Sequence, residues 1–274
     1  MASNYTIALN RMSAPRLTLP DYLALCQRLH VTHIEIRNDL DGVEINDGTS
    51  AAQVKALTAE AGITIRSINA LQRFEQFDQT RREEALALIQ YAAASGAEAL
   101  VLCPTNSKRD ARSPAERHTA LVDALKGLKP MLEDHGVLGL IEPLGFEECA
   151  VRRKSQAVLA IYDAAAENTY RLVHDTFHHH LAGESIFFPN LTGLIHVSGV
   201  EDGAVSVGDM RDMHRVLVGS ADRLGNIAQL KTLLARGYTG CISYEPFAEE
   251  VAASTDIENE LRASIAFIRD GIGG

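Results

Sequence analysis

Short apolar runs alternate with longer amphipathic stretches from one end of the chain to the other. The runs are four to six residues long and rich in Ile, Val and Leu, which is typical of parallel strands covered on both faces. The pattern predicts eight strands, at residues 5–9, 33–36, 63–68, 99–103, 137–141, 171–174, 194–197 and 241–244.

Helical signals fill the stretches between these strands. Four residue pairs have the spacing of a capping box, in which two side chains satisfy free amides in the first turn of a helix. The pairs are Ser50 with Gln53, Thr80 with Glu83, Ser113 with Glu116, and Thr255 with Glu258. Glycines at positions 62, 96, 136 and 237 then mark predicted helix ends, since glycine readily adopts the left-handed conformation found there.

The number and spacing of these units define the expected architecture. Eight strand–helix units in 274 residues average about 34 residues each, which is close to the repeat of a closed (β/α)8 barrel. A doubly wound open sheet is the alternative, but it usually has fewer strands, and no Gly-x-Gly-x-x-Gly turn follows the first run. We therefore predict an α/β protein with a single (β/α)8 TIM-barrel domain over residues 1–274.

Composition and charge narrow the functional class. The net charge of −10 gives no electrostatic footprint for nucleic-acid phosphates, and no run approaches the roughly 20 apolar residues of a membrane helix. The first residues lack a secretion-signal pattern, and the four cysteines form no Cys-x-x-Cys pair. We expect a cytoplasmic protein without a nucleic-acid or membrane partner, and assembly into a homo-oligomer stays open.

Ionisable residues stand at the ends of the last four predicted strands. Glu142, Asp175, His196 and Glu245 follow or end these strands, and the carboxyl ends of barrel strands converge on one mouth. Each residue alone could be a strand-end group bonded to a loop or an arginine. Three carboxylates brought together repel one another unless a cation neutralises them, and oxygen ligands with one imidazole suit Mn, Co, Zn or Mg. The sequence thus favours one divalent metal ion.

Other polar residues near the strand ends are weaker candidates. In the segment from His174 to His180, Asp175 is the expected ligand and one following histidine faces the mouth. Arg215, in the polar stretch from Arg211, either lies in a solvated loop or reaches inward to a substrate oxygen or a metal ligand. Asn69 could bind a hydroxyl group. Surface or loop-bonding charges are the simpler interpretation of Glu35 and Arg37, and Cys103 has no evident base partner for a nucleophile.

These motifs resemble the xylose-isomerase-like TIM-barrel superfamily of sugar isomerases and epimerases, which also includes endonuclease IV. The resemblance covers nearly the whole chain. Its strongest motifs are Ile141-Glu142-Pro143, Val173-His174-Asp175-Thr176-Phe177-His178, Ile195-His196-Val197 and Ser243-Tyr244-Glu245-Pro246-Phe247. Within the superfamily, Glu142-Pro143-Leu144-Gly145-Phe146 and Ile68-Asn69-Ala70-Leu71 look most like the 2-keto-myo-inositol (inosose) isomerases.

The resemblance implies a role for each candidate residue. Glu142, Asp175, His196 and Glu245 would coordinate one divalent metal ion. His178 and Arg215 would contact substrate oxygens, and Glu148 stands where some ketose epimerases place a substrate-binding carboxylate. The arginine loop departs from the family pattern, because relatives tend to have an Arg-x-x-Pro-Gly-like turn and here Val218 precedes Gly219.

The implied reaction removes a proton next to a ketone and passes through a cis-enediolate. Glu142 and Glu245 would remove and return the proton. The leading hypothesis is an isomerase of a cyclic polyol ketone, with a sugar or inositol-derived substrate. A ketose 3-epimerase, a hydroxypyruvate isomerase or a 3-keto-glycoside lyase would use the same site.

Two hypotheses from other classes remain. An endonuclease IV-like nuclease would need additional histidines where Asn69 and Cys103-Pro104 stand, although Asp212-x-His214 resembles part of its cluster. A noncatalytic sugar-binding protein could keep the barrel and the metal.

Overall fold

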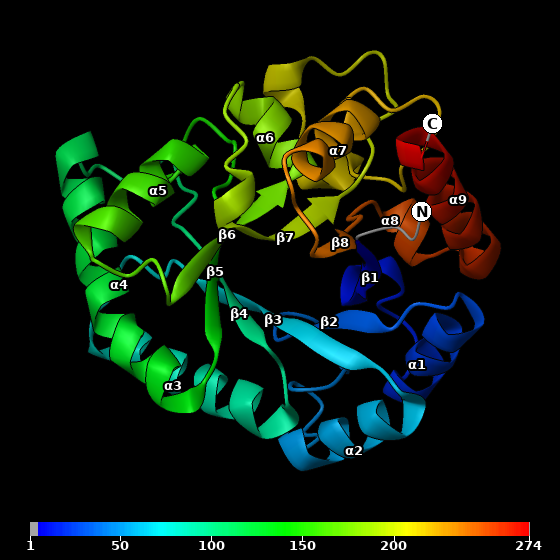
Figure 1. Ribbon diagram of the computed structural model, residues 1–274, viewed down its shortest axis with the longest axis horizontal. Coiled ribbons are helices and arrows are strands. Elements are labelled where there is room, and N and C mark those ends of the chain that lie inside the picture. Colours follow the sequence, from blue (N-terminus) through cyan, green and yellow to red (C-terminus); the bar gives the residue numbers. More distant parts are fainter. Residues whose placement is uncertain (1–4, 274) are drawn as a thin grey trace.

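The strands form one closed parallel barrel in the order of the sequence (Figure 1). The computed structural model describes residues 5–273. The strands are β1 Thr6–Asn10, β2 His33–Arg37, β3 Thr64–Gln72, β4 Ala99–Cys103, β5 Leu138–Ile141, β6 Tyr170–Asp175, β7 Thr192–Val197 and β8 Cys241–Tyr244. Pairing of β1 with β8, which matches Ala8 to Ser243, closes the ring. The predicted (β/α)8 TIM barrel is confirmed.

Helices surround the ring and cover its outer face (Figure 1). They are α1 Leu19–Arg28, α2 Ala51–Ala61, α3 Gln79–Ser95, α4 Pro114–His135, α5 Lys154–Asp163, α6 Thr176–Ala182, α7 Asn226–Ala235, α8 Glu249–Ala252 and α9 Ile257–Gly273. Short 3-10 turns are η1 Arg11–Ser13, η2 Pro189–Leu191, η3 Val207–Asp209 and η4 Asp212–His214. No helix in the described part of the chain is long and apolar enough to span a membrane.

Two of the four predicted capping boxes form. Ser50 with Gln53 and Ser113 with Glu116 each make both capping hydrogen bonds, and Pro114 occupies the first turn of α4. Gly62, Gly96 and Gly136 end their helices with positive φ, as the sequence predicted.

The other two predicted helix starts are wrong. Helix α3 begins earlier than Thr80, because the Asp78 carboxylate accepts a hydrogen bond from the Arg81 amide at 2.8 Å and caps the helix. Helix α9 begins at Ile257, and the Glu258 carboxylate is bound to the Arg28 and Arg262 guanidinium groups. In each case the carboxylate of the expected capping box has another partner, since Glu83 accepts a hydrogen bond from Gln79 Nε2 and Glu258 is bound by two arginines.

The interior has two apolar layers. The larger one packs the helices against the outside of the strands and includes the predicted α4 stripe, Leu121, Leu125, Leu128 and Leu132. The smaller one fills the barrel interior and includes Ala8, Val101, Leu140, Val173, Leu194 and Cys241. Strand side chains alternate between the two faces, so a residue two or four positions after one of these inner residues also points into the barrel. Glu142, Asp175 and His196 come two positions after Leu140, Val173 and Leu194, and Glu245 comes four positions after Cys241.

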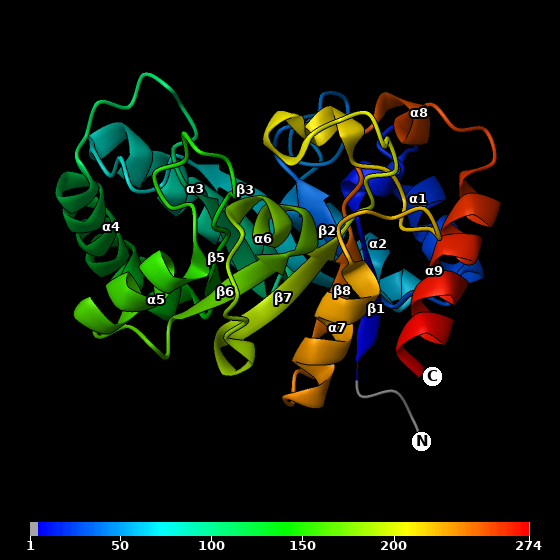
Figure 2. The same ribbon diagram turned by 90° about the horizontal axis from the view of Figure 1, so that it is seen from above.

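The connections that follow the strands lie on one side of the barrel. Figure 2 shows α6, α8 and the long loops before α4 and α7 on the same side, with the N-terminal end of β1 on the other. The carboxyl ends of the strands, with the polar residues that follow them, also lie on this side.

Candidate metal centre

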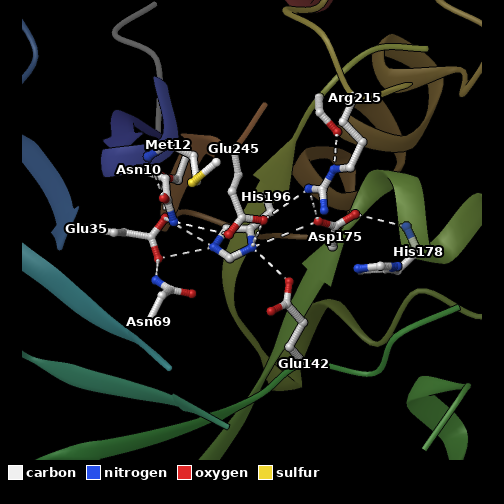
Figure 3. A network of polar contacts seen from close by, with 12 residues as sticks. Asn10, Met12, Glu35, Asn69, Glu142, Asp175, His178, His196, Arg215 and Glu245 are labelled. Atoms are coloured by element: carbon white, nitrogen blue, oxygen red, sulfur yellow. Dashed lines mark hydrogen bonds and ion pairs between the residues drawn. The ribbon is translucent and has the colours of Figure 1, made fainter. Parts of the chain in front are cut away.

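The four candidate ligands from β5, β6, β7 and β8 meet at one point. Each of Glu142, Asp175, His196 and Glu245 offers a ligand atom, and these atoms all lie within 4.8 Å of one another. All four side chains are buried, with no residue more than 4% exposed. Figure 3 shows them around the His196 ring, which lies between the carboxylates.

The ends of the strands fix the backbone of these residues. Asp175 is the last residue of β6 and pairs in register with His196 on β7. Glu142 and Glu245 directly follow β5 and β8, and their amides extend the ladder by donating to Leu102 O at 3.1 Å and Val197 O at 2.9 Å. A rigid parallel sheet therefore places the four side chains.

The two nitrogens of His196 face different partners. Nδ1 lies 2.9 Å from a Glu142 oxygen, 3.2 Å from Glu245 and 3.9 Å from Asp175. Nε2 lies 3.1 Å from the Glu35 carboxylate. Burial by itself would lower the pKa of His196, but the Glu245, Glu35 and Glu142 carboxylates raise it well above its ordinary value.

Glu35, on β2, is part of this network and is not a surface charge. It is fully buried, and its carboxylate accepts hydrogen bonds from Asn69 Nδ2 at 2.7 Å and from the Ser67 and Ser243 hydroxyls. Burial would raise the pKa of Glu35, but His196 lowers it to about 2. An ionised Glu35 favours a proton on Nε2 of His196 and leaves Nδ1 facing the three carboxylates, as carboxylate partners do for metal-bound histidines.

Two buried arginines hold Glu245. Arg37 Nη1 donates to Glu245 Oε1 at 2.8 Å, and Arg215 Nη2 donates to Glu245 Oε2 at 3.0 Å and to Asp175 Oδ2 at 2.6 Å. Although burial would raise the pKa of Glu245, His196, Arg215 and Arg37 hold it far below the ordinary value. Arg37 is therefore not a surface charge: it binds Asp39 in the loop after β2, which was one of the two sequence interpretations, and it also reaches Glu245.

Arg215 reaches inward, which was one of the two alternatives for its loop. It is 1% exposed, and its remaining nitrogens donate to Ser198 Oγ at 2.9 Å and Asp212 Oδ1 at 3.2 Å. Since each of its nitrogens already donates to a protein acceptor, Arg215 orients Asp175 and Glu245 in this geometry.

The donor set fits one divalent cation. Three carboxylates and the Nδ1 of an imidazole converge, which suits Mn, Co, Zn or Mg. Arg37 and Arg215 donate to Glu245 and Asp175, and His196 lies between the carboxylates; a bound cation would neutralise the three negative charges directly.

A cavity of about 540 Å³ lies next to the cluster, and two of the four residues, Glu142 and Glu245, are part of its lining. Its lining includes Glu142, Glu245, Asn69, His178 and Phe247. His178 is 4% exposed, and its Nδ1 has no hydrogen-bond partner in the described part of the chain. Its backbone amide donates to Asp175 Oδ1 at 2.9 Å, which sets the ring next to the cluster (Figure 3). A buried nitrogen without a partner at the wall of a cavity is suited to a ligand oxygen.

The remaining candidates lie differently. Asn69 borders the cavity, and its amide nitrogen donates to Glu35. Glu148 is half-buried and is not part of the cavity lining. Cys103 lines the cavity, and burial and Glu142 raise the pKa of its thiol well above the ordinary value, which disfavours a thiolate nucleophile.

The histidines of the segment from His174 to His180 have different surroundings. Only His178 lines the cavity among the histidines of this segment. His174 and His179 instead accept hydrogen bonds from the Lys154 ammonium at 2.8 and 2.9 Å. Their role in this structure is to hold the Lys154 side chain.

Sequence reasoning missed the contribution of β2, although a signal was present. Glu35 and Arg37 alternate with Ile34 and Ile36, so both charged side chains share the face opposite the two isoleucines. Charged residues on one face of a strand covered on both sides must point into the barrel, where they need partners.

Three comparisons bear on the family. A sequence model described as xylose isomerase-like TIM barrel matches residues 23–271. The inosose isomerase of Bacillus licheniformis is 31% identical over 134 residues, which is 47% of this chain and 47% of that protein. The match therefore spans about half the length of that relative.

Solved structures agree with this assignment. A xylose isomerase domain containing protein from Salmonella typhimurium LT2 superposes with a TM-score of 0.90 at 30% identity, over 97% of this chain and 98% of that one. The IolI protein, solved with a bound zinc atom, superposes with a TM-score of 0.84 at 22% identity, over 98% of each chain, and so shares the fold. The chain thus belongs to the xylose isomerase-like TIM barrel family.

Proposed function

We propose that this protein is a metal-dependent isomerase of a cyclic polyol ketone or ketose, similar to a 2-keto-myo-inositol isomerase. The observation that carries the proposal is the convergence of Glu142, Asp175, His196 and Glu245 within 4.8 Å at the base of the cavity. The similarity to an inosose isomerase supports the substrate class, and the zinc of the IolI structure supports a divalent ion.

A divalent cation held by these four residues would stabilise negative charge on a ketone oxygen and on the neighbouring hydroxyl oxygen. The chain itself supplies the groups that move the proton. Glu142 and Glu245 come from strands on either side of β6 and β7, so they approach a substrate on this cluster from two directions. One removes the proton next to the carbonyl to give a cis-enediolate, and one returns it.

The two carboxylates differ in their surroundings. Glu245 is held ionised by Arg37, Arg215 and Asn10, whose Nδ2 lies 3.2 Å from Oε1. Glu142 has the Cys103 thiol at 3.5 Å and His196 at 2.9 Å. We assign Glu142 and Glu245 as the acid and base pair, and the return of the proton to the neighbouring carbon gives isomerisation.

The substrate would be oriented by groups that border the cavity. His178 has a free ring nitrogen for a substrate oxygen, and Asn69 borders the same space. Arg215 steadies the two carboxylates that it contacts. Phe247 and Phe146 add apolar surface to the cavity wall.

Proton NMR in deuterated water tests the proposal. The metal-loaded protein is incubated with inososes, ketoses and hydroxypyruvate, and the signals of the protons next to the carbonyl are followed. We expect exchange and conversion of one inosose or ketose into its isomer. Inversion at a single carbon would instead favour the epimerase alternative, and an absence of exchange in every compound would contradict the whole group of reactions.

Variants of two neighbouring glutamates separate chemistry from binding. Glu245→Gln should retain substrate binding and lose exchange by about 10²-fold or more. The control is Glu249→Gln, since Glu249 is exposed and pairs with Arg16 on the surface. Full exchange in Glu245→Gln would remove Glu245 as an acid or base and leave it, at most, a ligand.

The metal content distinguishes the nuclease alternative. Among residues 5–273, one group of candidate ligands is found, and Asn69 and Cys103 stand at the ends of β3 and β4. We expect one ion per chain by elemental analysis, whereas three would favour an endonuclease IV-like centre.

A further inference from the structure

We propose that the substrate carries an anionic group, a carboxylate or a phosphate, and that Arg73 binds this group at the mouth of the cavity. The inference rests on the proposed function and narrows it, because it favours a ketose or polyol ketone that carries an acidic group over a neutral inosose. It starts from the three arginines that line the cavity, Arg37, Arg73 and Arg215.

Two of these arginines are committed to carboxylates of the protein. Arg37 binds Asp39 with two nitrogens at 2.7 Å and Glu245 with the third. Arg215 binds Asp175, Glu245 and Asp212. The Arg73 side chain is exposed and makes no hydrogen bond or ion pair with any of residues 5–273. It is therefore the cavity arginine whose guanidinium is available to a ligand.

The backbone around Arg73 is held in one conformation. Arg73 directly follows β3 and has a φ of +51°, a left-handed value that non-glycine residues adopt rarely. The next two residues, Phe74 and Glu75, are buried. Phe74 N donates to Cys103 O at 3.3 Å, and Gln76 N donates to Arg73 O at 3.0 Å. Unfavourable backbone geometry that the surroundings enforce is a recurrent property of ligand-binding positions.

Glu75 ties this turn to the loop after β4. Its carboxylate accepts hydrogen bonds from Thr105 N at 3.0 Å and Arg112 Nη2 at 2.7 Å. The loop carries Asn106 and Ser107, which line the cavity together with Arg73. A guanidinium and two neutral polar side chains therefore share one rim of the cavity, and this combination suits the oxygens of a carboxylate or phosphate.

The barrel places this rim opposite the metal cluster. In the closed order of strands, β3 lies across the ring from β7, and the four candidate ligands come from β5 to β8. The cavity of about 540 Å³ connects the two sides. A ketone whose reacting carbons lie at the cluster would thus present a distal anionic group to Arg73, Asn106 and Ser107.

Matched substrates test the inference through the rate of exchange. The probes are D-fructose, D-fructose 6-phosphate and 5-keto-D-gluconate, which are neutral, phosphorylated and carboxylated ketones. We expect kcat/KM for exchange to be about tenfold or more higher for one anionic probe than for D-fructose, and Arg73→Gln to abolish that preference. The preferred probe identifies a phosphate or a carboxylate. Equal or higher kcat/KM for D-fructose in the wild type would overturn the inference and leave the proposed function intact.

A binding measurement tests whether Arg73 binds an anion even if none of these compounds reacts. Inorganic phosphate and succinate are titrated calorimetrically into the metal-loaded wild type, Arg73→Gln and Arg109→Gln. Arg109 is the matched control, because both arginines are exposed and line the neighbouring hollow, but only Arg73 also lines the cavity. We expect Arg73→Gln to weaken one of these anions by about tenfold and Arg109→Gln to leave both unchanged. Equal affinities in all three proteins would overturn the role of Arg73, whereas failure of exchange alone would count against the isomerase.

Discussion

His196 Nε2 lies 3.1 Å from the carboxylate of Glu35, so the opposite nitrogen of the ring faces Glu142, Asp175 and Glu245. Glu35 has no arginine or lysine partner among the contacts of the described chain. A buried carboxylate without a cation is costly, and the imidazole N–H is its strongest donor. Glu35 therefore raises the pKa of His196, and His196 lowers the pKa of Glu35.

Replacing Glu35 with Gln should weaken metal binding by roughly 10- to 100-fold, because the ring loses the carboxylate that orients it and raises its basicity. The measurement is competition with a chromophoric chelator. Glu98→Gln is the control, since Glu98 pairs with Arg66 outside the barrel mouth. Wild-type affinity in Glu35→Gln would mean that Glu35 only fills space beside the ring.

Metal affinity should also depend on pH through His196. The carboxylates around His196 raise its pKa well above the ordinary value, so a proton on the ring competes with a cation for Nδ1. A cation that binds at Nδ1 must displace one proton, so affinity should fall about tenfold for each pH unit of acidification. Calorimetry in buffers of different ionisation enthalpy should show release of about one proton per ion. An affinity that stays constant from about pH 6 to 8 would contradict this account.

The fold and the four candidate ligands could be predicted because local rules determine both. Alternating apolar runs specify the strands, and the carboxyl ends of barrel strands always converge. Glu142, Asp175, His196 and Glu245 each lie at such an end, so their proximity follows from the strand order alone.

The contribution of β2 could not be obtained in the same way. Glu35 contacts His196 across the barrel interior, and the two residues are 161 positions apart in the sequence. Arg37 contacts Glu245 across 208 positions. The alternation along β2 indicates that both side chains point into the barrel, but the partners that they reach depend on side-chain length and packing in the filled interior, which neither periodicity nor spacing encodes. Glu148 is the opposite case. It lies close to the ligand Glu142 in the sequence, but it is on a loop and does not line the cavity.

Gly145 controls the position of the helix that carries His178. A Cβ at this residue would overlap the His178 carbonyl oxygen and lie 2.8 Å from Leu181 Cβ. Gly145→Ala should therefore push α6 away, lower the free energy of unfolding by about 1–3 kcal/mol and weaken substrate binding. Urea denaturation measures the first effect.

The control for this change is Gly208→Ala, where an added Cβ meets nothing within 4 Å. It reports the entropic effect of alanine on the unfolded chain, which is expected to be slightly stabilising. If both variants have the stability of the wild type, α6 can adjust and the close approach at Gly145 is unimportant.

Lys154 is a buried cation without a carboxylate at its ammonium. Its Nζ donates to His174 Nδ1 and His179 Nδ1, while Glu184 is bound to the backbone amides of Lys154 and Ser155. Burial lowers the pKa of Lys154 to about 7, against an ordinary value of 10.5. Burial also lowers the pKa of His179, to about 3, so its ring remains a neutral acceptor.

The lowered pKa of Lys154 makes the free energy of unfolding depend on pH. Between about pH 7 and 10.5 the unfolded chain holds a proton on Lys154 that the folded chain has lost. Stability must rise with pH wherever the unfolded state binds more protons, so the free energy of unfolding should gain a positive slope in this window. Lys154→Met should lack that contribution, and Lys126→Met, at an exposed position on α4, should keep it. Urea denaturation of the three proteins from about pH 7 to 10 measures the difference. Parallel stability profiles for wild type and Lys154→Met would show that Lys154 keeps its proton in the folded protein, with three donors shared between two imidazoles and solvent.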